Sequence, residues 1–255
     1  MVRKPPIRGF FYRKGRNMLS NLQVGFFNLV GQIITSSEYM GMIWEGLLYT
    51  LLISIGASVI GIVLGTLVAI VKIIPKKNPF MKGLNVICDI YTTVFRGTPM
   101  ALQLFIMSFA IFAIKGFPSE LVAIIAFGIN SGAYVSESIR AGILSVDIGQ
   151  TEAGRALGLS YGKTMWKIVI PQAIKNVIPA IGNEIIALIK ETSIVSMVGG
   201  IFDLTVAART IAGANNLANY LAPMTVVAMF YLAIVYSLTF AIKCIERRLR
   251  ASDKR

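Results

Sequence analysis

The stretch GLLYTLLISIGASVIGIVLGTLVAIV, at residues 46–71, contains no charged side chain. A helix of about 20 apolar residues is long enough to cross the hydrocarbon core of a bilayer. The stretch lies too far from the N-terminus, and is too long, to be a cleaved signal peptide. It therefore predicts a membrane-spanning helix and classes the chain as an integral membrane protein.

The composition of the whole chain supports that class. Of its 255 residues, 55% are hydrophobic and 15% are charged, and the mean hydropathy of +0.71 is far from that of a soluble globular domain. The net charge of +13 would suggest nucleic acid as the partner of a soluble protein, but the basic residues gather beside the apolar segments, as membrane topology requires. We therefore expect no nucleic-acid partner. Two isolated cysteines and no histidine argue against a metal site of the usual kind.

The apolar segments predict an all-α membrane protein with five transmembrane helices. The expected spans are residues 47–71, 84–114, 121–139, 176–198 and 223–242. The second span is interrupted at residues 96–99, Arg-Gly-Thr-Pro, because proline removes a helical hydrogen bond and such breaks are tolerated where protein surrounds them.

Small residues recur at every fourth position of the first span, at Ala57, Gly61, Gly65 and Ala69. This spacing lets two helix backbones approach closely. We expect the stripe to pack against another helix of the same chain rather than against a second subunit.

Basic residues follow the first, third and fifth spans. They are Lys72, Lys76, Lys77 and Lys82; then Arg140, Arg155, Lys163, Lys167 and Lys175; then Lys243, Arg247, Arg248, Arg250, Lys254 and Arg255. With five spans, all three groups lie on one side of the membrane, which the positive-inside rule identifies as the cytoplasm. The N-terminus is then expected outside and the C-terminus inside.

We divide the chain into a basic N-terminal extension (residues 1–45), a transmembrane domain (46–249) and a basic cytoplasmic tail (250–255). Within the extension, residues 22–34 are moderately apolar but are interrupted by Asn28, Gly31 and Gln32. An interfacial amphipathic helix is favoured there over a sixth, imperfect span.

Four polar residues lie on one arc of the fourth span: Asn183, Glu184, Lys190 and Glu191. At the helical repeat they fall within about 120° of one another. An ionisable group at a helix centre in lipid costs about 2.5–3.5 kcal/mol, so the arc should face a cavity or a partner. Asn183 and Glu184 are candidates for the lining of a transport path, whereas Lys190 and Glu191 suit packing, gate closure or solute contact equally well.

The third span carries Asn130 and Glu137 on one side. Asn130 is a further candidate for the path. Arg140 lies three residues after Glu137, where the two side chains can pair, and a structural ion pair is favoured over solute contact. For Arg96, an anchoring role beside Pro99 at the helix break is favoured over a role as a gate.

A polar, basic segment at residues 147–171 separates the third and fourth spans. It contains Glu152-Ala153-Gly154, then Gly158, then Ile-Val-Ile-Pro at residues 168–171. The segment is long enough for two short helices, and its pattern favours a partner on the cytoplasmic face. It resembles the EAA loop of ABC importer permeases, with Gly154 in place of the second Ala and Ile170 in place of Leu. The resemblance assigns contact with an ATPase to Glu152, Ala153, Gly154, Gly158, Ile168 and Pro171.

The resemblance covers residues 47–249, and the stretches at 95–99, 183–184 and 190–193 are similar to the polar amino acid uptake branch. It implies a type I permease core of five helices with a cytoplasmic coupling loop between helices 3 and 4. The implied setting is the bacterial inner membrane, with a second permease subunit (a homodimer or a related heterodimer), ATPase subunits that carry ATP and Mg, an external solute-binding protein and an amino acid substrate.

No enzymatic activity and no bound cofactor are expected of this chain. Residues 158–164 resemble a phosphate-binding loop, but three residues separate the glycines where the motif has four. An intramembrane enzyme would need a nucleophile beside a base, and none is visible.

An ion-coupled secondary amino acid transporter is the alternative function, although the chain shows no internal repeat. Which amino acid is carried stays open.

Overall fold

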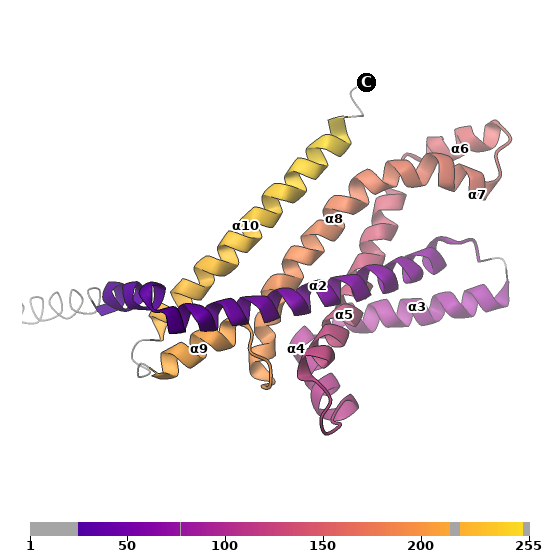
Figure 1. Ribbon diagram of the computed structural model, residues 1–255. Coiled ribbons are helices and arrows are strands. Elements are labelled where there is room, and N and C mark those ends of the chain that lie inside the picture. Colours follow the sequence, from indigo (N-terminus) through magenta and orange to yellow (C-terminus); the bar gives the residue numbers. More distant parts are fainter. Residues whose placement is uncertain (1–24, 77, 215–219, 252–255) are drawn as a thin grey trace, which may run out of the picture.

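The computed structural model describes residues 25–76, 78–214 and 220–251, and the regular structure within them is entirely helical (Figure 1). After a helix at Gly25–Thr35, the elements are α2 (Ser37–Ile73), α3 (Pro79–Gly97), α4 (Met100–Ile106), the π-helix η1 (Met107–Ile111), α5 (Ser119–Leu144), α6 (Ile148–Ala156), α7 (Tyr161–Thr164), the π-helix η2 (Met165–Val169), α8 (Ile170–Glu191), the 3₁₀-helix η3 (Thr192–Met197), α9 (Leu204–Ala214) and α10 (Leu221–Ala251). The expected all-α membrane fold is confirmed.

Helix α2 contains the stretch from which the fold class was predicted. It begins after Ser36, whose hydroxyl accepts a hydrogen bond from the Tyr39 N–H and so satisfies one of the free donors of the first turn. Large apolar side chains such as Leu52, Val59 and Val63 are more than half exposed along one side of the helix. An apolar surface of this length would be unfavourable in water, so it belongs in contact with lipid or with another apolar subunit.

The opposite side of α2 packs closely on α5. A Cβ atom added at Gly61 would lie 2.6 Å from the Ser131 hydroxyl, and one at Gly65 would lie 2.7 Å from Cβ of Val135. Only glycine permits this approach of the two backbones. The expectation that the small-residue stripe packs within the chain is therefore confirmed, and the α2–α5 contact is the most extensive between helices.

The second predicted span is broken where the sequence indicated. Helices α3 and α4 meet at an angle of 108°, with Thr98 and Pro99 both in extended backbone conformation between them. Together α3, α4 and η1 form a bent pair rather than one straight helix.

The predicted number of five spans is not confirmed. Within the described residues, three helices (α2, α5 and α10) are long and apolar enough to cross a bilayer, or four if the bent α3–α4 pair counts as one span. The expected fourth span corresponds to α8 and η3. Helix α8 is not among the three because its polar residues, which include Glu184 and Lys190, lower its hydropathy.

The helix Gly25–Thr35 is an apolar helix too short to span a membrane. Leu29 and Ile33 are buried in a cluster with residues of α9 and α10, while Phe27 and Ile34 are exposed. Part of the expected interfacial segment, residues 22–24, lies outside the described residues, as do most of the basic extension and the end of the C-terminal tail. The expected boundary at residue 45 falls inside α2.

The N-terminus of α9 is anchored by Asp203, a fully buried residue that sequence analysis did not identify. Its carboxylate accepts hydrogen bonds from the backbone N–H of Val206 (2.9 Å) and Thr205 (3.1 Å), as an N-cap does. Burial raises the pKa of the Asp203 carboxyl, and these hydrogen bonds oppose the rise. The N–H of Leu204 donates to the Thr50 hydroxyl (3.1 Å), so the cap also joins α9 to α2.

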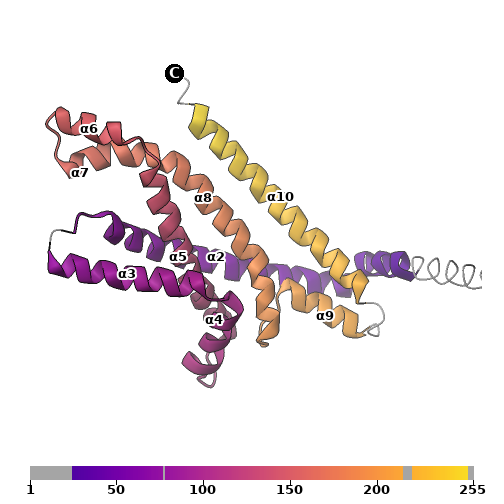
Figure 2. The same cartoon turned by 180° about the vertical axis from the view of Figure 1, so that it is seen from behind.

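The ends of the helices separate into two groups (Figures 1 and 2). In Figure 1 the C-terminal end of α10 lies at the top, the α6–α7 segment at the upper right and the α2–α3 connection at the right edge, whereas η1 lies at the bottom and α9 at the lower left. The three connections that carry the basic groups therefore lie at one end of the bundle. This arrangement agrees with the positive-inside assignment of that end to the cytoplasm.

Candidate coupling segment and polar transport face

The segment between α5 and α8 folds into two short helices, α6 and α7, as its length predicted. Asp147 caps α6, because its carboxylate accepts a 2.7 Å hydrogen bond from the Gly149 N–H. Helix α7 continues through η2 into α8. The segment projects from the end of the bundle in both ribbon views (Figures 1 and 2).

The turn that reverses the chain after α6 depends on Gly158. Its φ of +77° lies in the left-handed region, where a side chain is strained. The Gly158 N–H donates to the carbonyl of Arg155 (2.9 Å) and the Leu159 N–H to that of Gly154 (3.1 Å). This pair of bonds is the Schellman arrangement of a helix C-terminus, so the glycine of the sequence pattern has a conformational role.

Gly154 permits the close contact between the two arms of the segment. It is buried, and a Cβ atom at this position would lie 2.7 Å from Cγ2 of Thr164 and 3.1 Å from Cδ1 of Ile168. The departure from Glu-Ala-Ala therefore has a packing reason in this chain. Ile168 of the pattern contributes to the same contact.

The outward side of the segment is apolar and exposed. Leu157 is 80% exposed, and Ile148 and Trp166 are each 74% exposed. The pattern residues Glu152 and Ala153 are also exposed on α6. Pro171 is exposed at the second residue of α8, directly after the π-helix η2. Large exposed apolar side chains at the end of a membrane bundle indicate a surface that another protein covers.

The four polar residues of α8 divide into two pairs. Asn183 and Lys190 are exposed, whereas Glu184 and Glu191 are partly buried. Each pair is spaced by seven residues and so shares one side of the helix. Of the four residues expected on one arc, two are thus exposed on the surface of this chain and two are turned partly into the bundle.

Glu184 faces α5, where the Ser131 hydroxyl is within interaction range of its carboxylate. The Ser131 oxygen is fully buried and has no hydrogen bond of good geometry among the described residues. The Glu184 carboxylate and the Ser131 hydroxyl therefore lie close together between α8 and α5.

Asn130, the other candidate for the path, braces the helix break. Its amide nitrogen donates to the Phe95 carbonyl (3.1 Å) and to Oε1 of Gln103 (2.9 Å). Gln103 in turn donates to the carbonyls of Phe95 (2.9 Å) and Thr98 (3.1 Å). Both amide hydrogens of Asn130 are therefore used within the bundle, where the residue is buried.

Glu137 pairs with Arg140 as the sequence suggested: Nε and Nη2 of Arg140 lie 2.9 and 2.8 Å from Oε2 of Glu137. Sequence analysis missed the second partner, Lys72, whose Nζ lies 2.6 Å from Oε1 of the same carboxylate and 3.1 Å from Oδ1 of Asp89. Lys72 was assigned only to the group of basic residues that sets the topology. The sequence did contain a signal for this pairing, because Lys72 directly follows a long apolar stretch. A cation in that position must either extend its ammonium group to water or form an ion pair.

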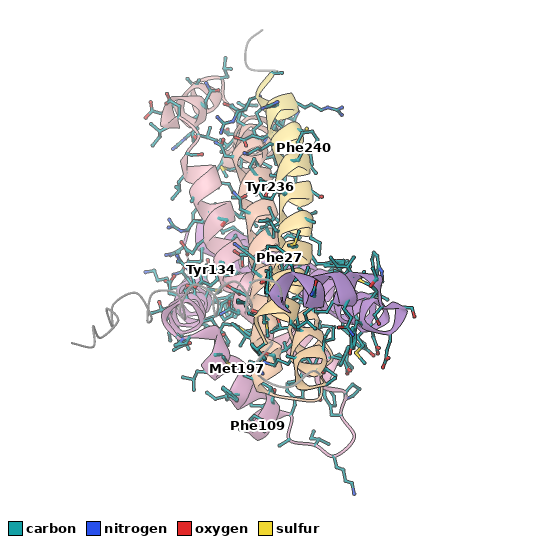
Figure 3. All side chains as sticks on the ribbon, turned by 90° about the vertical axis from the view of Figure 1, so that its left-hand side faces the viewer. Phe27, Phe109, Tyr134, Met197, Tyr236 and Phe240 are labelled. Atoms are coloured by element: carbon teal, nitrogen blue, oxygen red, sulfur yellow. The ribbon has the colours of Figure 1, made fainter. Side chains whose placement is uncertain are left out.

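Arg96 lies beside the ion pairs that Glu137 forms with Lys72 and Arg140. Its guanidinium lies over the Tyr134 ring at 5.4 Å, and its Nη1 is 4.0 Å from Oε2 of Glu137. Tyr134 projects from the outside of α5 in Figure 3. Pro99 is the N-cap residue of α4. The structure thus brings Arg96 to the α5 ion pair and places Pro99 at the break.

Within the described residues, no group of three or more potential metal ligands is present. Lys163 is exposed on α7, and no strand precedes it in that part of the chain, so the context of a phosphate-binding loop is missing.

Comparison with known proteins identifies the architecture. Residues 61–251 match the family described as "Binding-protein-dependent transport system inner membrane component". The chain is 43% identical over 213 residues to the arginine transport system permease protein ArtQ of Bacillus subtilis, covering 83% of this chain and 94% of that protein. It is 42% identical over 223 residues to a putative glutamine transport system permease protein, GlnP, of Rickettsia bellii, covering 86% and 98%.

Solved structures agree in fold. A chain of the crystal structure of an amino acid ABC transporter with histidines superimposes with a TM-score of 0.77 at 35% identity, over 85% of this chain and 98% of that one. A chain of the inward-facing MetNI methionine ABC transporter gives a TM-score of 0.67 at 19% identity, over 84% and 99%. The resemblance seen in the sequence is confirmed, and the family does not favour the ion-coupled alternative. The chain belongs to the family of inner-membrane components of binding-protein-dependent transport systems, and it is a transport subunit rather than an enzyme.

Proposed function

We propose that this chain is the permease subunit of an ATP-driven importer of polar amino acids. The single observation that carries the proposal is the preformed α6–α7 segment with its exposed apolar surface at the cytoplasmic end of the bundle. Relatives named as permeases for arginine, glutamine and cystine support amino acids as the solute class.

The α6–α7 segment is proposed to dock into a separate ATPase subunit, which binds ATP and Mg. Its exposed residues Ile148, Leu157 and Trp166 would supply buried apolar contacts in the complex. Gly154 and Gly158 shape the segment rather than contact the partner. Because the segment is continuous with α8 through η2, a movement of the docked segment is transmitted directly to the helix that carries the polar face.

The solute path is proposed to run along the polar face of α8. Glu184 can accept a hydrogen bond from a substrate ammonium group, and the amide of Asn183 can both donate and accept. Lys190 and Glu191 extend the face toward the outer end of the helix. The exposed position of Asn183 and Lys190 is suited to a path completed by a second permease subunit, either a copy of this chain or a related one.

On the outer side, a solute-binding protein is proposed to deliver the amino acid to the end of the bundle that carries η1 and η3. Phe109 and Met197 project at that end in Figure 3 and are 62% and 59% exposed. A partner of this kind requires an accessible contact surface, and these side chains provide apolar anchors for it.

The test is uptake by sealed vesicles that contain the permease with its ATPase subunits and its solute-binding protein. Uptake of a labelled amino acid should need ATP and should be competed by a subset of polar amino acids among the twenty. ATP-independent uptake that collapses with a protonophore would contradict the proposal and support ion coupling.

A further inference from the structure

A cavity of about 320 Å³ lies at the cytoplasmic end of the bundle, between the transmembrane helices and the coupling segment. Its wall is formed by the ends of α2 and α5 together with α6, α7 and η2, and it includes Lys72, Arg140, Thr151 and Tyr161 beside apolar side chains such as Ile143 and Val169. The proposed function does not use this cavity. Of the described residues that line it, none is acidic.

Arg140 is the group in this cavity that can bind an additional anion. Its recorded contacts within the described residues engage Nε and Nη2, both directed to Glu137. A guanidinium carries five N–H donors in a planar fork that matches phosphate oxygens. Lys72 contributes positive charge, although its ammonium group is already occupied by Glu137, Asp89 and Thr92.

The remaining lining distinguishes a lipid from a free phosphate ion. Thr151 and Tyr161 carry hydroxyl groups that can donate to phosphate oxygens, but most of the wall is apolar, with Ile73 and Leu144 from the ends of two spanning helices. Tyr161, which lines the cavity, is 43% exposed on α7, and exposed Tyr is typical of the membrane–water boundary. A phosphodiester with attached glycerol and acyl chains fits both the cations and the apolar wall.

We infer that this cavity binds the headgroup of an anionic phospholipid, with the phosphate on Arg140 and the glycerol and upper acyl chain along the apolar wall. Basic pockets between transmembrane helices on the cytoplasmic side are known to bind such headgroups. A lipid in this position contacts α2, α5 and the α6–α7 segment at once. It would therefore link the composition of the inner leaflet to the position of the coupling segment.

The test uses the transporter complex of the permease with its ATPase subunits, purified in detergent, and native mass spectrometry to count retained lipids. Dioleoyl phosphatidylglycerol and dioleoyl phosphatidylcholine are the probes, because they share acyl chains and differ in headgroup charge. Two variants address the site: Arg140→Gln removes the cation, and Val146→Trp fills the cavity without changing charge. Lys82→Gln is the matched control, because Lys82 is exposed on α3 on the same side and does not line the cavity.

We expect the wild type and Lys82→Gln to retain phosphatidylglycerol in preference to phosphatidylcholine. Arg140→Gln should lower this retention about fivefold, as expected for the loss of one basic side chain at a lipid surface, and Val146→Trp should lower it at least as much. If Arg140→Gln fails to assemble, Val146→Trp decides the question alone.

Equal retention of phosphatidylglycerol by the wild type and Val146→Trp would overturn the inference, as would equal retention of the two lipids by the wild type. Displacement of phosphatidylglycerol by millimolar inorganic phosphate would assign the cavity to a free anion instead. Because lipid retention is measured by mass, it can fail while ATP-driven uptake persists, and the site and the proposed function are tested separately.

Discussion

The ammonium nitrogen of Lys72 and the carboxylate of Glu137 lie 2.6 Å apart, although 65 positions separate the two residues in the chain. The side chains are 10% and 17% exposed, so neither charge is well hydrated without the other. The pair connects the C-terminal parts of α2 and α5, two helices that also pack closely at Gly61 and Gly65.

Glu137→Gln should therefore destabilise the protein far more than Arg140→Gln. Without the charge of Glu137, Lys72 keeps one carboxylate partner, Asp89, which is half exposed, and the neutral Thr92 hydroxyl. A buried charge that loses its main partner typically costs about 3–5 kcal/mol. Arg140 is 38% exposed and can turn to water, so its loss should cost less than about 1 kcal/mol. The measurement is the free energy of unfolding of both variants, obtained by titration with a denaturing detergent. If both variants lose the same free energy, the ion pair of Lys72 with Glu137 does not contribute to stability.

In the coupling segment, Gly158→Val should leave the membrane bundle folded but weaken the complex with the ATPase and abolish uptake. The reason is the φ of +77° at this residue, which a β-branched side chain disfavours. Co-purification of the ATPase and stimulated ATP hydrolysis are the measurements. Normal stoichiometry together with normal stimulation would contradict this role. Gly162→Val, in the same segment at a glycine without positive φ, is the matched control and should retain more coupling.

Gly154→Ala should impair coupling even though the family pattern allows alanine there. The new methyl group would lie 2.7 Å from Cγ2 of Thr164, and overpacking of this kind costs about 1–3 kcal/mol. Thr164→Ser removes that Cγ2 atom, so the double variant Gly154→Ala/Thr164→Ser should recover much of the stimulated ATP hydrolysis. If the double variant is no better than Gly154→Ala, the contact with Thr164 is not the cause.

Glu184→Gln should lower uptake or change which amino acid is preferred, while assembly and basal ATP hydrolysis are retained. Removing the charge takes away an acceptor for a substrate ammonium group but leaves the shape of the side chain. Uptake and thermal stability measured on the same purified variant distinguish this from a structural role. Normal transport, or a lower melting temperature with unchanged selectivity, would remove Glu184 from the path. Glu246→Gln, at an acid paired with Arg250 near the end of α10, should leave selectivity unchanged.

At the helix break, Gln103→Leu and Asn130→Leu should each cost about 1–2 kcal/mol of stability, because each removes side-chain hydrogen bonds inside the bundle. The two losses should be less than additive in the double variant, since the side chains share a 2.9 Å hydrogen bond. Gln32→Leu, at an exposed position, should change stability by less than about 0.5 kcal/mol. Strict additivity would mean that the shared bond does not couple the two residues.

The orientation can be tested with single cysteines at Ser37 and Ser252 in a background that lacks Cys88 and Cys244. The basic groups at one end of the bundle predict an external position 37 and a cytoplasmic position 252. An impermeant thiol reagent applied to intact cells should label the first and not the second. Labelling at position 252 would reverse the topology.

Much of the fold was accessible from the sequence because the signals are local. The uncharged run at residues 46–71 predicts α2, Pro99 predicts the break between α3 and α4, and the length of the segment at residues 147–171 predicts two short helices. The ends were less predictable, since α2 begins at Ser37, nine residues before the apolar run that predicted it. The number of five spans was not confirmed by length and hydropathy, because the polar face of α8 lowers the mean hydropathy of that helix.

The sequence by itself determined the class, the helix break and the coupling segment, because hydropathy, proline and glycine act through neighbouring residues. Only the tertiary structure decided which polar groups meet. It brought Lys72 to Glu137, directed Asn130 to the Phe95 carbonyl, and separated the exposed Asn183 from the half-buried Glu184. Such partnerships join residues far apart in the chain, and in a membrane bundle they depend on the rotation of each helix about its axis, which packing against the other helices sets.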